Sequence, residues 1–265
     1  MSDRADALLV WYDAVRRPLP WRSTRDPYAL LVSEVMLQQT QAARVVPYYE
    51  AFLTRFPDPA ALAAAPARDV LAAWSGLGYN RRALALQAAA RVVAARGWPA
   101  DLTELLGVGP YTAAAIASFA WDAQRAAVDV NARRVIERWD GRRRTPRPLA
   151  ARAAELLPPR RAAAWNQAMI ELGATVCTAR APRCDACPVA AWCTSAGAPA
   201  AAPPAAAPRP RFEDTDRYAR GRIVAALLED RALPALDAER LERALAGLAR
   251  DGLIVRDAAG TPALP

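Results

Sequence analysis

Residues 106–112 read LGVGPYT and lie between two stretches in which apolar residues have helical spacing. The two glycines, Gly107 and Gly109, predict a tight turn that exposes backbone N–H groups at the start of the next helix. An exposed helix N-terminus is a natural seat for a phosphate. Further along, residues 128–131 read VDVN, and an aspartate within such an apolar stretch predicts a helix N-cap. The glycine turn taken alone also fits an ordinary loop.

The rest of the chain up to residue 195 also predicts helices, so we expect an all-α fold. Apolar residues recur three and four positions apart, Ala and Leu dominate, and strand-like alternation of useful length is absent. Asp26 followed by Pro27 predicts a helix start, and we expect this helix to run through Leu37 towards Pro47. The other predicted helices cover residues 67–74, 80–96, 110–120, 130–139, 148–157 and 161–176.

The composition changes sharply at residue 196. Residues 196–211 read AGAPAAAPPAAAPRPR, which predicts an extended linker because proline runs cannot form helices or ladders. Two helical patterns follow, at 217–229 and 237–250, and a small hairpin is predicted within 251–264. This order predicts a small winged-helix-like module at 212–265.

All four cysteines lie within seventeen residues, with the spacing C-x6-C-x2-C-x5-C. They are Cys177, Cys184, Cys187 and Cys193. Two disulfides would require an oxidising compartment, which nothing else in the sequence indicates. Four thiolates suit a tetrahedral zinc ion and equally suit a 4Fe–4S cluster. The spacing alone leaves both open, although zinc ribbons normally use two CxxC pairs.

The charge of the chain favours a polyanionic partner. The 265 residues carry a formal charge of +8, and the sequence pI is near 9.9, so nucleic acid is the simplest candidate. Every basic residue is arginine, because the sequence contains neither histidine nor lysine. Histidine catalysis, histidine metal ligation and lysine Schiff bases are therefore excluded. No signal segment and no bilayer-spanning stretch is evident, so we expect a soluble intracellular protein.

The glycine turn, Asp129 and the cysteine loop occur in the order that is typical of one family. Together they resemble the helix–hairpin–helix, Gly-Pro/Val-Asp arrangement of the endonuclease III superfamily of DNA glycosylases, whose 4Fe–4S loop has this cysteine spacing. Further motifs resemble the MutY-type adenine DNA glycosylases of that superfamily. These are LPWR at 19–22, DPY at 26–28, VSEVMLQQTQ at 32–41, GLGY at 76–79 and NQAMIELGA at 166–174.

The resemblance implies a two-lobed, all-α helix–hairpin–helix glycosylase fold. It places a six-helix barrel at 22–125 and an iron–sulfur domain at 1–21 and 126–195, in which the four cysteines bind one 4Fe–4S cluster. The usual C-terminal domain of the family inspects 8-oxoguanine. We expect that domain to be absent or replaced by the predicted module at 212–265.

Two carboxyl groups carry the expected chemistry. Excision of adenine is a glycoside-type hydrolysis, which needs an acid to help the base leave and a negative charge beside the oxocarbenium-like sugar. Glu34 lies among apolar residues, so we expect a raised pKa and the role of acid towards adenine N7. Asp129 is expected to supply the negative charge at C1′, or a transient adduct there. The resemblance assigns the same roles, and it implies that Asn131 orients Asp129 and that Tyr111 hydrogen-bonds within the pocket.

The adenine must leave the duplex before it can react. The resemblance implies that Gln39 and Tyr79 occupy the vacated stack and that Arg17, Arg22 and Gln167 contact the extruded adenine or its catalytic neighbours. The full set of residues expected to contact DNA or substrate is Arg17, Arg22, Gln39, Thr40, Leu77, Tyr79, Gly107, Gly109 and Gln167. Thr40 and Leu77 match family residues near the opposite base.

Strand cleavage is not expected. Relatives of the endonuclease III type attack C1′ with a lysine at the hairpin, where this sequence has Tyr111, and the chain contains no lysine. We therefore expect a monofunctional enzyme that removes adenine opposite 8-oxoguanine or guanine from double-stranded DNA, as a monomer in the bacterial cytoplasm and at the nucleoid. One alternative is a glycosylase for thymine or damaged pyrimidine opposite guanine. Another is a non-catalytic, cluster-bearing DNA-binding protein, which the presence of both Glu34 and Asp129 disfavours.

Overall fold

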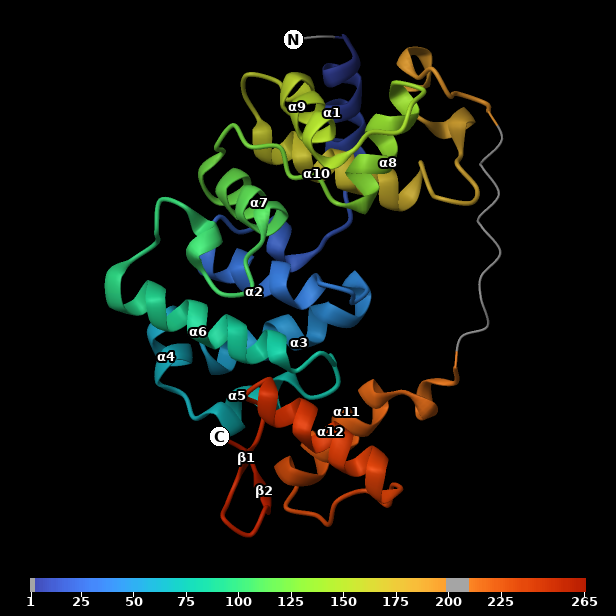
Figure 1. The fold of residues 1–265 in the computed structure, drawn as a ribbon. Helices are drawn as coiled ribbons and strands as arrows, with labels where there is room; N and C mark the ends of the chain where they lie inside the picture. Colours follow the sequence, from blue (N-terminus) through green and yellow to red (C-terminus); the bar gives the residue numbers. More distant parts are fainter. Residues whose placement is uncertain (1–2, 199–209) are drawn as a thin grey trace. The chain divides into compact units, whose positions relative to one another are not determined.

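The structure is a computed structural model that describes residues 3–198 and 210–265. Its regular secondary structure is almost entirely helical, which confirms the predicted all-α fold class (Figure 1). The described residues form two compact units, one from 3–34 and 109–198 and the other from 35–108 and 210–265. The domain boundaries drawn from the sequence stay a prediction, and residues 199–209 of the predicted linker lie outside the described residues. No helix in the described part of the chain is long and apolar enough to cross a membrane.

The first unit combines the N-terminal segment of the chain with a second segment that starts at Gly109. Helix α2 starts in this unit, where both carboxylate oxygens of Asp26 accept backbone N–H groups of the first turn, from Tyr28 at 3.0 Å and Ala29 at 3.2 Å. The elements of the unit are α1 (Asp3–Val15), η1 (Pro20–Arg22), α2 (Pro27–Leu37), α7 (Pro110–Trp121), α8 (Val130–Trp139), α9 (Pro146–Leu156), α10 (Ala162–Thr175), η3 (Cys184–Ala186) and η4 (Ala190–Trp192).

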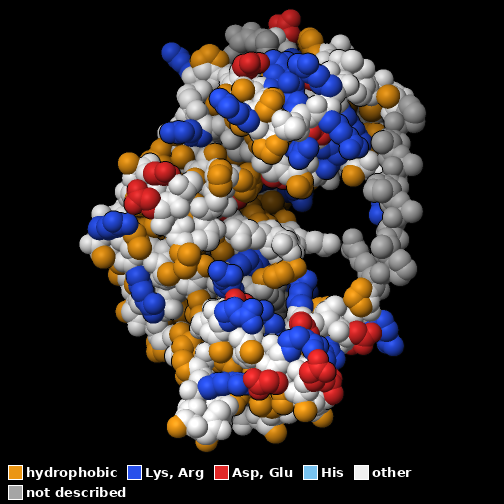
Figure 2. Space-filling view, viewed as in Figure 1, with side chains coloured by type: hydrophobic (Ala, Val, Ile, Leu, Met, Phe, Trp, Pro, Cys, Tyr) orange, Lys and Arg blue, Asp and Glu red, His pale blue; other side chains and the backbone are white. Residues whose placement is uncertain are grey.

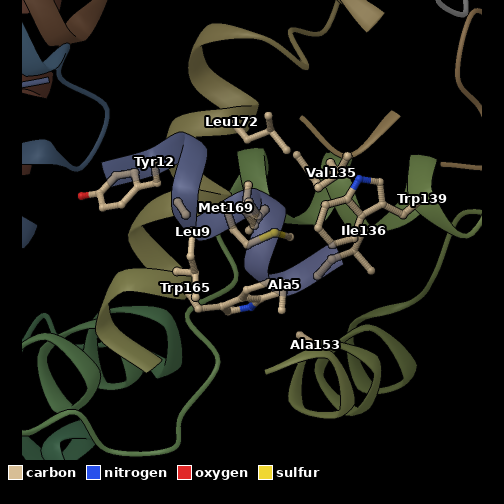
Figure 3. Packing of buried hydrophobic residues seen from close by; sticks show 14 of the residues in the cluster. Ala5, Leu9, Tyr12, Val135, Ile136, Trp139, Ala153, Trp165, Met169 and Leu172 are labelled. Atoms are coloured by element: carbon tan, nitrogen blue, oxygen red, sulfur yellow. The ribbon is translucent and has the colours of Figure 1, made fainter. Parts of the chain in front are cut away.

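Three helices supply most of one buried hydrophobic cluster in the first unit. In Figure 3, side chains of α1, α8 and α10 point toward one another, and α10 packs against both α1 and α8. On each helix the buried residues recur three or four apart, which places them on one face. They include Ala5, Leu9 and Tyr12 of α1, Val135, Ile136 and Trp139 of α8, and Trp165, Met169 and Leu172 of α10. This packing fixes α8, which begins directly after Asp129, against α10.

The second unit combines the middle of the chain with its C-terminal segment. Its core contains an aromatic cluster in which Phe52 lies edge-on to Phe56 and Trp74, with ring centroids 5.0 and 6.0 Å apart. The elements of the unit are the end of α2, α3 (Ala42–Arg55), α4 (Pro59–Ala64), α5 (Ala67–Trp74), α6 (Arg81–Arg96), η2 (Leu102–Glu104), η5 (Phe212–Asp214), α11 (Asp216–Leu228), α12 (Ala238–Arg250), β1 (Val255–Arg256) and β2 (Pro262–Ala263).

One predicted helix was wrong in its extent. The helix that begins at Pro27 ends at Leu37 instead of continuing towards Pro47, and a new helix, α3, starts at Ala42. The chain reverses at Gln39, whose φ of +58° is left-handed and cannot continue an α-helix. The turn leaves Gln39 exposed.

The C-terminal segment follows the predicted order of helix, helix and hairpin. Helix α11 packs on α12, and β1 pairs antiparallel with β2, with Val255 opposite Ala263. The winged-helix assignment itself stays a prediction.

Candidate active site

Glu34 is a buried acid on α2. The residue is 6% exposed, and its neighbours Ser33 and Val35 are also buried. Tyr111, near the start of α7, hydrogen-bonds to the Glu34 carboxyl. Burial, together with the negative charge of Asp129, outweighs this hydrogen bond and raises the pKa of Glu34 to about 7. The predicted rise in pKa is therefore present, and Glu34 can hold or release a proton near neutral pH.

Asp129 has a different environment, because it is the N-cap of α8. Its Oδ1 accepts the backbone N–H groups of Asn131 at 2.9 Å and Ala132 at 2.7 Å, and its Oδ2 accepts the Asn131 side-chain amide at 2.7 Å. Three hydrogen-bond donors at the positive end of a helix stabilise an anion. They also restrict the orientation of the Asp129 side chain. The Asn131 side chain therefore contacts the Asp129 carboxylate directly, and its role in orienting Asp129 stays a prediction.

The segment that leads into Asp129 is held from α10. Asn166 donates its amide to Ser118 Oγ and to the carbonyl of Arg125, both at 2.8 Å, and it accepts the N–H of Ala127 at 3.0 Å. A methyl group on Gly173 would lie 2.6 Å from Cβ of Asn131, so only glycine permits this approach of α10 to α8.

Arg134 ties Asn131 to the cysteine loop. Its guanidinium donates to Asn131 Oδ1 at 2.8 Å, to the Gly173 carbonyl at 2.6 Å and to the Cys177 carbonyl at 2.8 Å. One turn later, Arg138 donates to the Cys177 sulfur at 3.3 Å. The loop that carries the cysteines is therefore hydrogen-bonded to the same helix that Asp129 caps.

The structure brings Arg17 and Arg22 together on one buried carboxylate, Glu171. Arg17 binds both oxygens of Glu171 at 2.7 Å, and Arg22 binds one of them at 2.6 Å. Burial alone would raise the pKa of Glu171, but the hydrogen bonds from the two arginines outweigh it and lower that pKa. Gln167, one turn earlier on α10, accepts the hydroxyl of Tyr12 at 2.5 Å. Arg22 also lies 5.6 Å from the Tyr12 ring centroid, so the two sets of polar contacts are neighbours in the first unit.

Gln39 and Tyr79 share an unusual backbone. Both have left-handed conformations, with φ of +58° and +50°, and both side chains are exposed. A non-glycine residue in this region is strained by about 1–3 kcal/mol, and such residues cluster at functional sites. Thr40 is half-buried beside Gln39, whereas Leu77 is buried, with 4% of the residue exposed.

Arg82 joins the turns that hold Gln39 and Tyr79. Its Nη1 donates to the carbonyls of Val35, Met36 and Gln38 at 2.5–3.0 Å, which are acceptors that the end of α2 leaves unpaired. Its Nη2 reaches Gly78 O at 3.0 Å. Burial lowers the pKa of Arg82 to about 10, so the guanidinium stays charged at neutral pH. A half-buried cation therefore sets the relative position of both turns.

The glycine turn has the geometry that its sequence predicts. Gly107 has a φ of +83°, and Gly109 is the N-cap of α7, followed by Pro110 in the first turn. Leu106 is 60% exposed and both glycines are exposed, so the tip of the hairpin is open to a large ligand. Gln38 donates to the Gly107 carbonyl at 3.4 Å.

The four cysteines surround one cavity of about 460 Å³ in the first unit. None of the four forms a disulfide, and all four are half-buried. Five arginines line the same cavity, and their positive charge suits a group held by four thiolates. They are Arg134, Arg138, Arg142, Arg143 and Arg183. The donor set and the room inside it fit a 4Fe–4S cluster, which needs one thiolate for each iron.

The surface carries its charge unevenly. Figure 2 shows arginines gathered over part of the first unit with few acidic side chains among them, whereas acidic and basic side chains are mixed on the C-terminal segment. A surface rich in arginine favours a polyanion such as DNA.

Sequence reasoning missed three polar residues of the site. Glu171 had a signal, because it is a carboxylate within the apolar run NQAMIELGA. Arg82 and Arg134 had none, because they are two of many arginines and act on carbonyl groups that only the fold brings near them.

Comparison with known proteins agrees with this geometry. Residues 32–159 match the family model of the HhH-GPD superfamily base excision DNA repair protein, and residues 177–193 match the iron–sulfur binding domain of endonuclease III. Cys177, Cys184, Cys187 and Cys193 are thus the ligands of a 4Fe–4S cluster.

Relatives cover the full length of the chain. An adenine DNA glycosylase of Mycolicibacterium smegmatis is 42% identical over 287 residues, which cover 100% of this chain and 97% of that protein. One from Mycobacterium tuberculosis is 42% identical and covers 97% of this chain and 92% of its own. Among solved structures, a thermostable thymine-DNA glycosylase has a TM-score of 0.67 and 30% identity, and covers 72% of this chain and 93% of its own. The chain therefore belongs to the adenine DNA glycosylase family, within the HhH-GPD superfamily of base excision DNA repair proteins.

Proposed function

We propose that the protein excises adenine that is mispaired with 8-oxoguanine or guanine in double-stranded DNA, by hydrolysis of the N-glycosidic bond. The observation that carries the proposal is the pair of carboxyl groups in the first unit. Glu34 is buried and has a pKa near 7, whereas Asp129 is half-buried and accepts three hydrogen bonds. Such a difference in environment lets one carboxyl group act as an acid while the other acts as an anion.

Glu34 supplies the proton in this proposal. Adenine is a poor leaving group as an anion, and protonation at N7 lets it depart neutral. An acid with a pKa near 7 is protonated in a large part of the molecules at neutral pH. Tyr111 holds the Glu34 carboxyl by its hydrogen bond and limits its orientation.

Asp129 stabilises the sugar in this proposal. As the glycosidic bond breaks, positive charge develops on C1′ and the ring oxygen, and a carboxylate whose position is fixed beforehand lowers the energy of that state. Asn131 and the first turn of α8 fix that position. The carboxylate either stabilises the cation until water attacks or bonds to C1′ transiently.

The exposed turns of the second unit bind and distort the duplex. Gln39 and Tyr79 have left-handed backbones and exposed side chains, which suit insertion into a base stack from which adenine has been flipped. The hairpin at Gly107 and Gly109 binds the phosphate backbone. Arg17, Arg22 and Gln167, held by Glu171 and Tyr12, contact the extruded base or its catalytic neighbours.

The reaction ends at an abasic site. Strand cleavage by β-elimination through a lysine imine cannot occur, because the chain contains no lysine. We therefore propose a monofunctional enzyme, and we expect it to act as a monomer.

A base-release assay on purified protein tests the proposal. Duplexes of one sequence that contain A:8-oxoG, A:G, T:G or A:T are incubated with excess enzyme, and the free base and the abasic strand are quantified. We expect adenine from the first two duplexes, without strand breaks before alkali treatment. Faster release of thymine from T:G than of adenine from A:8-oxoG would favour the rival function of a thymine glycosylase. The likeness to a thymine-DNA glycosylase structure raises that alternative.

A further inference from the structure

The C-terminal segment packs within the second unit next to Tyr79. Arg68 of α5 forms an ion pair with Asp230 at 2.5 Å and donates to the carbonyl of Leu228 at 2.8 Å. Helix α11 itself contacts α5. The segment after the linker is therefore attached to the unit that carries the exposed turns.

Arg217, in the first turns of α11, covers the side chain of Tyr79. Its guanidinium carbon lies 4.0 Å from the ring centroid, and its Nη1 donates to the Tyr79 hydroxyl at 2.8 Å. Its Nη2 would lie 3.5 Å from a methyl group placed on Gly78. One guanidinium therefore contacts both the ring face and the hydroxyl of Tyr79, a residue that is 37% exposed.

Tyr79 needs such a partner. Its left-handed backbone is flanked by Gly78, with a φ of +72°, and its ring is partly exposed, so contacts with neighbouring side chains determine the orientation of the ring. Arg82 also lies 5.4 Å from the ring centroid, but its hydrogen bonds go to backbone carbonyls. Only Arg217 of these two combines stacking with a hydrogen bond to the ring's own hydroxyl.

We propose that Arg217 is a positioning residue that holds the Tyr79 ring ready to enter the base stack. The C-terminal segment thereby takes part in mismatch recognition, although it lies far along the chain from the carboxyl groups. The role in recognition rests on the function proposed above. The pairing of the two residues does not.

The test compares four variants for binding to duplexes that cannot be cleaved, with 2′-fluoro-adenine opposite 8-oxoguanine or thymine. The variants are Arg217→Ala, Arg217→Lys, Arg222→Ala and Tyr79→Ala. Arg222 is an exposed arginine of the same helix, so its loss is the matched control for charge. Arg217→Lys retains the cation but not the planar guanidinium.

We expect Arg217→Ala to reduce the preference for the mispaired duplex about tenfold, the sum of a lost stacking contact and a lost charged hydrogen bond. Arg222→Ala should weaken binding to both duplexes by the same factor and leave the preference unchanged. Arg217→Lys should recover part of the preference. 2-Aminopurine placed beside the mispair should brighten less with Arg217→Ala than with the control, because the neighbouring base stays stacked.

A double-mutant cycle separates coupling from general damage. In the Tyr79→Ala background, the loss of Arg217 should have no further effect on the preference. The proposal is overturned if Arg217→Ala matches Arg222→Ala, or if it has the same effect with and without Tyr79. Failure of the wild-type protein to release adenine would overturn the proposed function instead, and the cycle on duplex affinity would still decide the coupling.

Discussion

Glu34 and Asp129 are both carboxyl groups, yet their places on helices give them opposite surroundings. Glu34 lies on a buried face within α2, with one hydrogen bond from Tyr111. Asp129 precedes α8 and receives three hydrogen bonds at a helix N-terminus. A helix interior deprives a carboxyl group of donors, whereas a helix N-terminus supplies them. The comparison teaches that a buried helix face and a helix N-terminus give the same type of side chain two different chemical environments.

The largest expected effect is that of Glu34→Gln. Glutamine has nearly the same shape but no proton to give, so adenine release in a single turnover should slow by about 10⁴-fold, the upper end of general acid catalysis. Glu50→Gln, at an exposed position of α3, is the matched control and should leave the rate unchanged. A near-normal rate for Glu34→Gln would assign the acid to another group.

Asp129→Asn should have the next largest effect. The amide oxygen can still cap α8, but the charge beside the developing cation is lost, so we expect a rate about 10²–10³-fold lower. Asp58→Asn, which changes the N-cap of α4, controls for damage to a helix cap. Equal effects of the two substitutions on the rate would show that capping, and not charge, is what Asp129 contributes.

The pH dependence of the stability of Glu34→Gln tests the raised pKa of the buried Glu34 without any substrate. Because the folded-state pKa of Glu34 is raised to about 7 from an ordinary value of 4.5, the wild type binds a proton more tightly when folded. Relative to Glu34→Gln, its stability should be equal below about pH 4.5, fall as the pH rises to about 7, and stay lower by up to about 3 kcal/mol above that. Urea unfolding of both proteins across pH measures the difference. A constant difference at all pH values would contradict the raised pKa.

The smallest expected effect is that of Arg134→Ala, which tests how the surroundings of Asp129 fix its orientation. Arg134→Ala removes the donor shared by Asn131, Gly173 and Cys177, so we expect Asp129 to be oriented less tightly and the rate to fall about tenfold, as for the loss of about 1–2 kcal/mol. Arg133→Ala, on the exposed side of the same helix, is the control. The visible absorbance of the cluster, read in parallel, reports whether the cysteine loop has loosened. An unchanged rate would show that Asn131 needs no support from Arg134.

Much of the fold could be predicted because its helix boundaries have local causes. Asp26 with Pro27, and Gly109 with Pro110, are cap and first-turn pairs that act within a few residues, and the structure has helices beginning there. The break at Gln39 could not be predicted. Nothing in the run LQQTQA forbids a helix, and the turn is set by Arg82, which comes from a distant part of the sequence.

The candidate site divides in the same way. The surroundings of Glu34 and the cap at Asp129 could be predicted, because apolar neighbours and an N-cap followed by Asn131 lie next to these residues in sequence. The pairing of Arg17 and Arg22 with Glu171 spans more than a hundred residues, and so does the contact between Arg217 and Tyr79. Such contacts depend on the tertiary fold, and periodicity or capping in one sequence carries no trace of them.

The pH dependence of adenine release in a single turnover tests the central claim most directly. The measurement uses excess wild-type enzyme on an A:8-oxoG duplex, from about pH 5 to about pH 9, with Glu34→Gln beside it. If protonated Glu34 is the acid, the wild-type rate should be level at low pH and fall tenfold for each pH unit above a pKa near 7, while the slow rate of Glu34→Gln lacks this step. A wild-type rate that stays level through pH 9, or a step at about the same pH in Glu34→Gln, would contradict the account.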